Sequence, residues 1–145
     1  MSEVDETGQE VLSPEECRRL LRQRRLGRVG LVEGGYPLVL PVNYVFDDDA
    51  VVFRTAMGTS LARAAAVAAV LAFEIDETDT VYHGGWSVLV RGAAEQVGDP
   101  ERIEQLRALP VRPWIHRASP VWIRIAAEHV TGRRIPASGP PGGSV

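Results

Sequence analysis

The spacing of apolar residues near the N-terminus predicts an amphipathic helix over residues 14 to about 27. Ser13 is placed to cap this helix, Pro14 to be its first residue, and Glu16 to complete a capping box. Gly27 is expected to end the helix, because glycine commonly follows the last helical turn. The apolar residues that share its inner face are Cys17, Leu20 and Leu21.

After this helix the pattern changes to that of β-strands. Segments 27–33 and 36–46 are rich in branched and aromatic residues, and Gly34-Gly35 between them is a two-residue hairpin signal. A further strand is predicted within 46–55, after the three carboxylates Asp47-Asp48-Asp49. Three adjacent carboxylates could suggest a metal site, but neighbouring residues point apart and aspartate is a common turn former, which favours a turn.

The second half of the chain continues in strands. Segments 70–76 and 85–97 contain runs that are apolar on both faces, which predicts burial on both sides, in a barrel wall or at a subunit interface. Segment 121–135 predicts one or two final strands after a loop at 110–120. The count is six or seven strands, and most connections are too short for parallel crossovers. The sequence therefore predicts a mainly β protein with short helices, built as an antiparallel barrel.

Two more short helices are predicted between these strands. One runs from Ser60 to about Ala66, and the other follows Asp99 as N-cap and Pro100 as first residue. The inner face of the second is formed by Ile103, Leu106 and Leu109.

The polar or Pro/Gly-rich ends set the expected domain limits. We expect a disordered leader at 1–11, one domain at 12–135, and a disordered tail at 136–145. The leader is acidic and does not resemble a signal peptide, and no apolar segment reaches transmembrane length. With the single cysteine Cys17 excluding an internal disulfide, the default expectation is a cytoplasmic protein.

Charge limits the partners and the chemistry. A net charge of −3 gives no general attraction to nucleic acid or to a membrane, and neither is expected as a partner. Six arginines lie between Arg18 and Arg28, but acidic residues precede them as the helix dipole prefers, which favours a solvated helix face over a ligand patch. The chain has no lysine, which excludes Schiff-base chemistry and a P-loop lysine.

The stretch VFRTAMGTSLARAA (52–65) carries the strongest chemical signal. A strand ends in Arg54-Thr55, turns through Gly58, and opens a helix at Thr59-Ser60. Guanidinium, hydroxyl and free backbone N–H groups are the donors with which a protein holds a phosphate without a metal. The sequence therefore indicates a phosphate site here, the alternative being a surface turn.

Other catalytic arrangements are not found. The chain has neither a nucleophile-elbow serine motif nor the dinucleotide-binding glycine fingerprint. Its histidines, His83, His116 and His129, are isolated from each other and from Cys17, so no metal site is expected. No catalytic side chain is identified, and we expect a cofactor to supply the chemistry.

Blocks of the sequence resemble the pyridoxamine 5′-phosphate oxidase-like proteins, and more closely the short bacterial branch of FMN-binding split barrels. The blocks are GRVGLV, LPVNYVF, VVFRTAMGTSLARA, FEID, GWSVLVRGAAEQV and VTGRRI, spread over residues 12–135. The resemblance implies a six-stranded antiparallel split β-barrel that forms a homodimer with two FMN molecules between the subunits. It also implies a flavin-dependent oxidoreductase that transfers hydride or electrons to a small-molecule substrate.

The resemblance assigns site residues by position. The phosphate would be surrounded by Arg54, Thr55, Thr59 and Ser60. The isoalloxazine ring would lie along Pro41, Val42, Asn43 and Tyr44, and the partner subunit would close the site with Trp86 and Ser87. Val42 and Tyr44 could equally be barrel residues, and Trp86 could be core packing.

Family members commonly have a lysine where this chain has Ser60. We expect Arg63, one turn further along the helix, to compensate for the missing charge. A C-terminal segment that binds substrate in true pyridoxamine phosphate oxidases is also absent, so that activity is not expected. Deazaflavin, haem held by a histidine, and a cofactor-free binding module remain alternatives to FMN.

Overall fold

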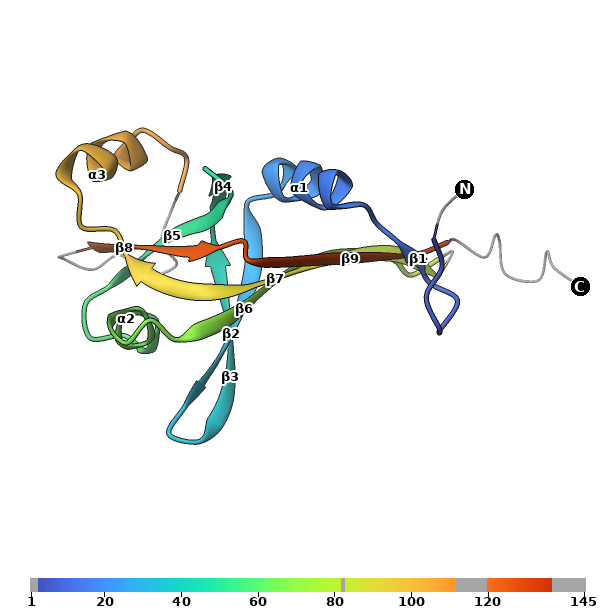
Figure 1. Ribbon diagram of the computed structural model, residues 1–145, viewed down its shortest axis with the longest axis horizontal. Coiled ribbons are helices and arrows are strands. Elements are labelled where there is room, and N and C mark those ends of the chain that lie inside the picture. The colour runs from blue at the N-terminus through green and yellow to red at the C-terminus, as the bar shows by residue number, and fades with distance from the viewer. Residues whose placement is uncertain (1–2, 82, 112–119, 137–145) are drawn as a thin grey trace, which may run out of the picture.

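The computed structural model describes residues 3–81, 83–111 and 120–136 (Figure 1). Its elements in chain order are β1 (Glu10–Val11), α1 (Pro14–Gln23), β2 (Leu26–Glu33), β3 (Tyr36–Asn43), β4 (Val45–Asp47), β5 (Ala50–Ala56), α2 (Ser60–Ala66), β6 (Val70–Asp79), β7 (Gly84–Gln96), α3 (Pro100–Arg107), β8 (Pro120–Ala126) and β9 (His129–Ile135).

The strands form one antiparallel sheet. Its main path runs β3-β2-β6-β7-β8-β5-β4, while β9 pairs with both β7 and β1. The path does not return to its starting strand, so the sheet stays open in the part of the chain that the structure describes. The mainly β antiparallel class is confirmed. The strand count is higher than predicted, because the short β1 was not predicted and segment 36–46 divides into β3 and β4.

The long strand β7 bends the sheet by changing its partner. Residues Gly85 to Arg91 pair with β9, whereas Ala94 to Gln96 pair with β8. Gly92 lies at this change and packs against the β8–β9 corner, where a Cβ would come within 1.8 Å of the Ala126 carbonyl oxygen. Only glycine fits there without moving backbone.

Side chains of β5 and β8 separate into two cores. Phe53 and its cross-strand neighbour Ile123 face the main core, which lies between the sheet, α1 and α2. Val52 and Trp122 face a smaller core beneath α3, together with Leu106. Because strand side chains alternate between faces, both faces of these strands are buried. Ile103 and Leu109 pack against the smaller core, although Leu109 follows the end of α3 and is not on its predicted inner face.

Helix α1 begins at the predicted residue but ends earlier, and the Glu16 carboxylate binds Arg19 and Arg134 instead of completing the predicted capping box. Ser13 caps it, with its hydroxyl accepting from the Glu16 amide at 3.1 Å, and Pro14 is its first residue. The prediction that Gly27 ends the helix is wrong, because α1 ends at Gln23 and Gly27 pairs with Val42 inside β2. A Cβ on Gly27 would lie 2.3 Å from the Phe73 ring, so packing rather than helix termination requires glycine there.

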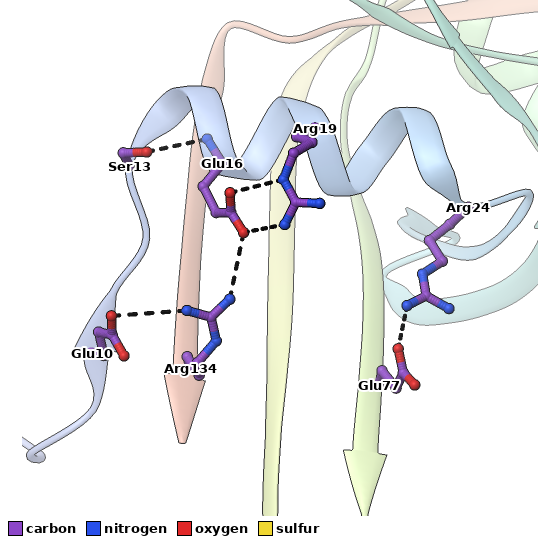
Figure 2. Close-up of polar contacts among 7 residues, drawn as sticks. All are labelled: Glu10, Ser13, Glu16, Arg19, Arg24, Glu77 and Arg134. Carbon is purple, nitrogen blue, oxygen red and sulfur yellow. Dashed lines mark hydrogen bonds and ion pairs between the residues drawn. The ribbon is translucent and has the colours of Figure 1, made fainter. Parts of the chain in front are cut away.

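Ion pairs hold α1 across β9 (Figure 2). Glu16 accepts from Arg19 on its own helix and from Arg134 of β9, at 3.5 Å for the second pair. Arg134 also lies 3.8 Å from Glu10 of β1. The Arg19 hydrogen bond is the main reason that the pKa of Glu16 is below its ordinary value.

Of the six arginines from Arg18 to Arg28, three lie on α1 and three follow its end, and Arg18 and Arg24 are half-buried, so they do not form the single solvated helix face that was predicted. Four of them pair with carboxylates inside the chain: Arg18 with Asp49, Arg19 with Glu16, Arg24 with Glu77, and Arg28 with Glu74 and Asp76. Of the three adjacent carboxylates, Asp47 is the last residue of β4, and only Asp48 and Asp49 form the predicted turn, both with positive φ. Asp47 pairs with Arg102 of α3 instead of joining Asp49.

The leader differs from the expected disordered segment. The Asp5 carboxylate accepts hydrogen bonds from the Thr7 and Gln9 amides, and Glu10–Val11 forms β1 against β9. Of the loop expected at 110–120 and the tail expected at 136–145, residues 112–119 and 137–145 lie outside the described residues. No helix in the described ranges is both long and apolar enough to cross a membrane.

Candidate functional site

The turn between β5 and α2 is organised by two threonines. Thr59 is the N-cap of α2, and its hydroxyl accepts from the Ala62 amide at 3.2 Å and donates to the Ala56 carbonyl at 2.9 Å. Since that hydroxyl has one proton, Thr55 must be the donor in the 3.0 Å contact between the two threonine hydroxyls. Gly58 has φ of +79°, which allows the tight turn, and the predicted helix from Ser60 to Ala66 is confirmed.

Ser60 and Arg63 on α2 bind a carboxylate that the sequence did not indicate. The Ser60 hydroxyl donates to Oε2 of Glu33, and Arg63 donates to Oε1 through Nε at 3.0 Å and through Nη2. Arg63 is also fixed by a 2.6 Å hydrogen bond from Nη1 to the Gly58 carbonyl. The Ser60 hydroxyl first, and then Arg63, lower the pKa of Glu33.

Glu33 was missed because its position has no local signal. It is the last residue of β2, immediately before the Gly34-Gly35 turn, and 27 residues separate it from Ser60. The pairing of β2 with β6, the strand that follows α2, brings the two ends together.

Arg54 does not join this group. It lies opposite Trp122 in the β5–β8 register, and its guanidinium carbon is 5.7 Å from the centre of the Trp122 ring. Trp122 belongs to the core beneath α3, whereas Thr55 faces the other side of the strand. The Arg54 Nε atom is buried without a hydrogen-bond partner in the described part of the chain. The structure therefore brings together Thr55, Thr59, Ser60 and Arg63, and places Arg54 on the opposite face.

Residues 41–44 lie at an end of the sheet. Strand β3 is terminal in the strand order, so its outer edge has no neighbouring strand among the described residues. Val42 and Tyr44 are buried in the main core. This burial agrees with the alternative that their side chains pack inside the barrel. The Tyr44 hydroxyl donates to the Leu21 carbonyl at 2.7 Å, and burial raises the pKa of this phenol. Pro41 is exposed and Asn43 half-buried.

Trp86 and Ser87 lie near the start of β7, far from α2 within one chain. Trp86 pairs with Glu77 on β6, whereas Val70, just after α2, pairs with Ala93. Seven residues of strand separate these positions, or about 23 Å. A single chain therefore does not close the α2 group with Trp86 and Ser87.

The surroundings of Ser87 contain both acidic and basic side chains. Ser87 and Trp86 line a cavity of about 250 Å³ together with Glu74 and Asp76. Burial and then the neighbouring Asp76 raise the pKa of Glu74 to about 7, although both carboxylates contact Arg28. Arg133 lines the same cavity, so groups of both charges surround Ser87.

Two of the three histidines, His83 and His129, lie among the described residues. His83 is exposed, with φ of 55° in the turn before β7, and His129 is exposed as the first residue of β9. His116 lies outside the described residues. Within the described ranges, no three His, Cys, Asp or Glu side chains are grouped as a metal site would require.

An open, antiparallel, bent sheet with helices closing its core defines a split-barrel protein, and solved structures with this fold match the chain. The chain belongs to the pyridoxamine 5′-phosphate oxidase family, whose model matches residues 13–134.

Individual relatives cover most of the chain. The FAD binding protein from Mycobacterium smegmatis is 35% identical, with a TM-score of 0.74 over 87% of this chain and 99% of that one. An FAD-binding protein from Mesorhizobium loti is 26% identical, with a TM-score of 0.71 over 87% and 97% of the two chains. The uncharacterized protein Rv0080 of Mycobacterium tuberculosis is 35% identical over 130 residues, or 87% of this chain and 85% of its own.

Proposed function

We propose that the protein binds a flavin nucleotide, with the flavin phosphate on Thr55, Thr59, Ser60 and Arg63, and acts as a flavin-dependent oxidoreductase. The proposed phosphate site rests on one observation: Ser60 and Arg63 already bind the anionic carboxylate of Glu33. The chemistry of these donors therefore suits a phosphate, which accepts the same charge-assisted hydrogen bonds.

The bound flavin would supply hydride or electron transfer to a small substrate. The chain itself would bind the phosphate at α2 and lay the open edge of β3 along the ring. We propose no side chain of the protein as catalytic.

FMN is the form that the resemblance implies, while the Mycobacterium smegmatis relative, at 35% identity, is an FAD binding protein. We propose FMN or FAD as the cofactor. Titration of the purified protein with each nucleotide separates them, since the preferred form binds with the lower Kd.

The Glu33 ion pair also favours a second candidate, a cofactor-free binding module. Glu33 satisfies Ser60 and Arg63 without any ligand. Absence of binding to FMN, FAD and riboflavin at millimolar concentration would support this candidate.

We further propose a homodimer in which Trp86 and Ser87 of one subunit close the flavin site of the other. Four exposed apolar side chains lie on the sheet face turned away from the main core: Leu26, Val32, Val39 and Val70. Exposed apolar side chains gathered on one face are typical of an interface. Light scattering should give twice the chain mass of 15.8 kDa, and a monomer mass would contradict the proposal.

Replacement of Arg63 by alanine is expected to weaken FMN binding at least severalfold, because it removes the only cation that the structure places beside Ser60 and Thr59 among the described residues. Quenching of flavin fluorescence gives the Kd. Arg107→Ala is the matched control, since Arg107 is also exposed and also pairs with a glutamate, on α3. Equal FMN affinity of Arg63→Ala and the wild type would refute the assignment of Arg63.

A further inference from the structure

We propose that Glu33 competes with the flavin phosphate for Ser60 and Arg63, and so sets the affinity of the site for its cofactor. This inference rests on the proposed flavin site. It follows from the contacts of Glu33, which uses both carboxylate oxygens: Oε2 accepts from Ser60 and Oε1 accepts from Arg63. A phosphate on the same donors must replace these hydrogen bonds.

The carboxylate and a phosphate cannot share the donors at low cost. Both are anions, and like charges a few ångströms apart repel each other. The Ser60 hydroxyl and Arg63 lower the pKa of Glu33, so this group stays ionised at neutral pH. Cofactor binding must therefore either displace the Glu33 carboxylate or be weakened by its repulsion of the phosphate.

Glu33 is placed to leave without disturbing the core. Its side chain is 39% exposed, and that of Arg63 is 59% exposed, so their ion pair is of the kind that contributes little to stability. Glu33 is followed directly by the Gly34-Gly35 turn at the tip of the β2–β3 hairpin. A change of side-chain rotamer releases the donors.

The donors keep their places when Glu33 leaves. The Gly58 carbonyl accepts from Arg63 at 2.6 Å, and Ser60 is fixed in the backbone of α2. Arg63 is also 3.3 Å from the Ser60 hydroxyl. Glu33 is thus not needed to position Arg63, which distinguishes a competitor from a supporting residue.

The test compares Glu33→Gln with wild type in titrations with FMN and with riboflavin, which lacks the phosphate. Glu33→Gln is expected to lower the Kd for FMN roughly three- to tenfold and to leave the Kd for riboflavin unchanged. Glu104→Gln is the matched control, because it removes the same charge from an exposed Arg–Glu pair on α3. A thermal melt of each variant without ligand confirms that it is folded.

In an Arg63→Ala background the gain from Glu33→Gln should shrink, because the main shared donor is gone. If the wild type binds FMN and Glu33→Gln binds FMN with equal or lower affinity, the inference about Glu33 is overturned, while the proposed flavin site is not. Equal tightening toward FMN and riboflavin would also overturn it, since the effect would not pass through the phosphate. If wild type ignores FMN but Glu33→Gln binds it, the inference is supported. If neither binds FMN, FAD or riboflavin, the proposed function fails and the inference with it.

Discussion

Replacement of Gly92 by alanine is expected to lower the free energy of unfolding by at least about 3 kcal/mol. The added methyl group would come within 1.8 Å of the Ala126 carbonyl oxygen and 2.9 Å of its carbonyl carbon. Both are backbone atoms of the β8–β9 corner, so no side-chain rotation relieves the clash. Urea denaturation followed by tryptophan fluorescence measures the loss.

Gly98→Ala is the matched control for this substitution. A Cβ on Gly98 meets no atom within 4 Å, so its unfolding free energy should stay within about 0.5 kcal/mol of wild type. Similar stability of the Gly92 and Gly98 variants would contradict the partner change that we describe for β7.

Phe73→Ala is expected to cost about 3–5 kcal/mol of unfolding free energy. The Phe73 side chain is fully buried, and the centre of its ring lies 4.7 Å from the centre of the Tyr44 ring in an edge-on arrangement. It also fills the space above Gly27 that a side chain would otherwise occupy. The truncation leaves a cavity where β2, β3 and β6 meet, and urea denaturation measures the cost.

Phe73→Leu provides the comparison, because it keeps most of the volume and should cost clearly less than the alanine variant. An alanine variant as stable as wild type would show that Phe73 does not hold these strands together.

The elements that local chemistry specifies were predictable from sequence. Ser13-Pro14, Thr59-Ser60 and Asp99-Pro100 begin the three helices where the cap residues predicted them. The Gly34-Gly35 hairpin is also confirmed, because a two-residue turn sets the register of its own strands.

Positions decided by distant contacts were not predictable in this way. Gly27 resembled the end of a helix in the sequence. Glycine is required there because the ring of Phe73, 46 residues further along the chain, packs against it. Glu33 reaches Ser60 only through the order of the strands, which no local pattern shows.

Arg54 is a different case, because the signal was in the sequence. Adjacent residues of a strand point to opposite faces, so Arg54 and Thr55, both within β5, could not both face α2. Its role toward a cofactor stays a prediction, as do those of Pro41, Asn43, Trp86 and Ser87.

The absorption spectrum of the purified protein, recorded before and after incubation with FMN or FAD and removal of the excess, tests the flavin assignment most directly. We expect a retained flavin spectrum at one flavin per chain. A protein that stays colourless after incubation with either nucleotide, or one that shows a haem band instead, would contradict it.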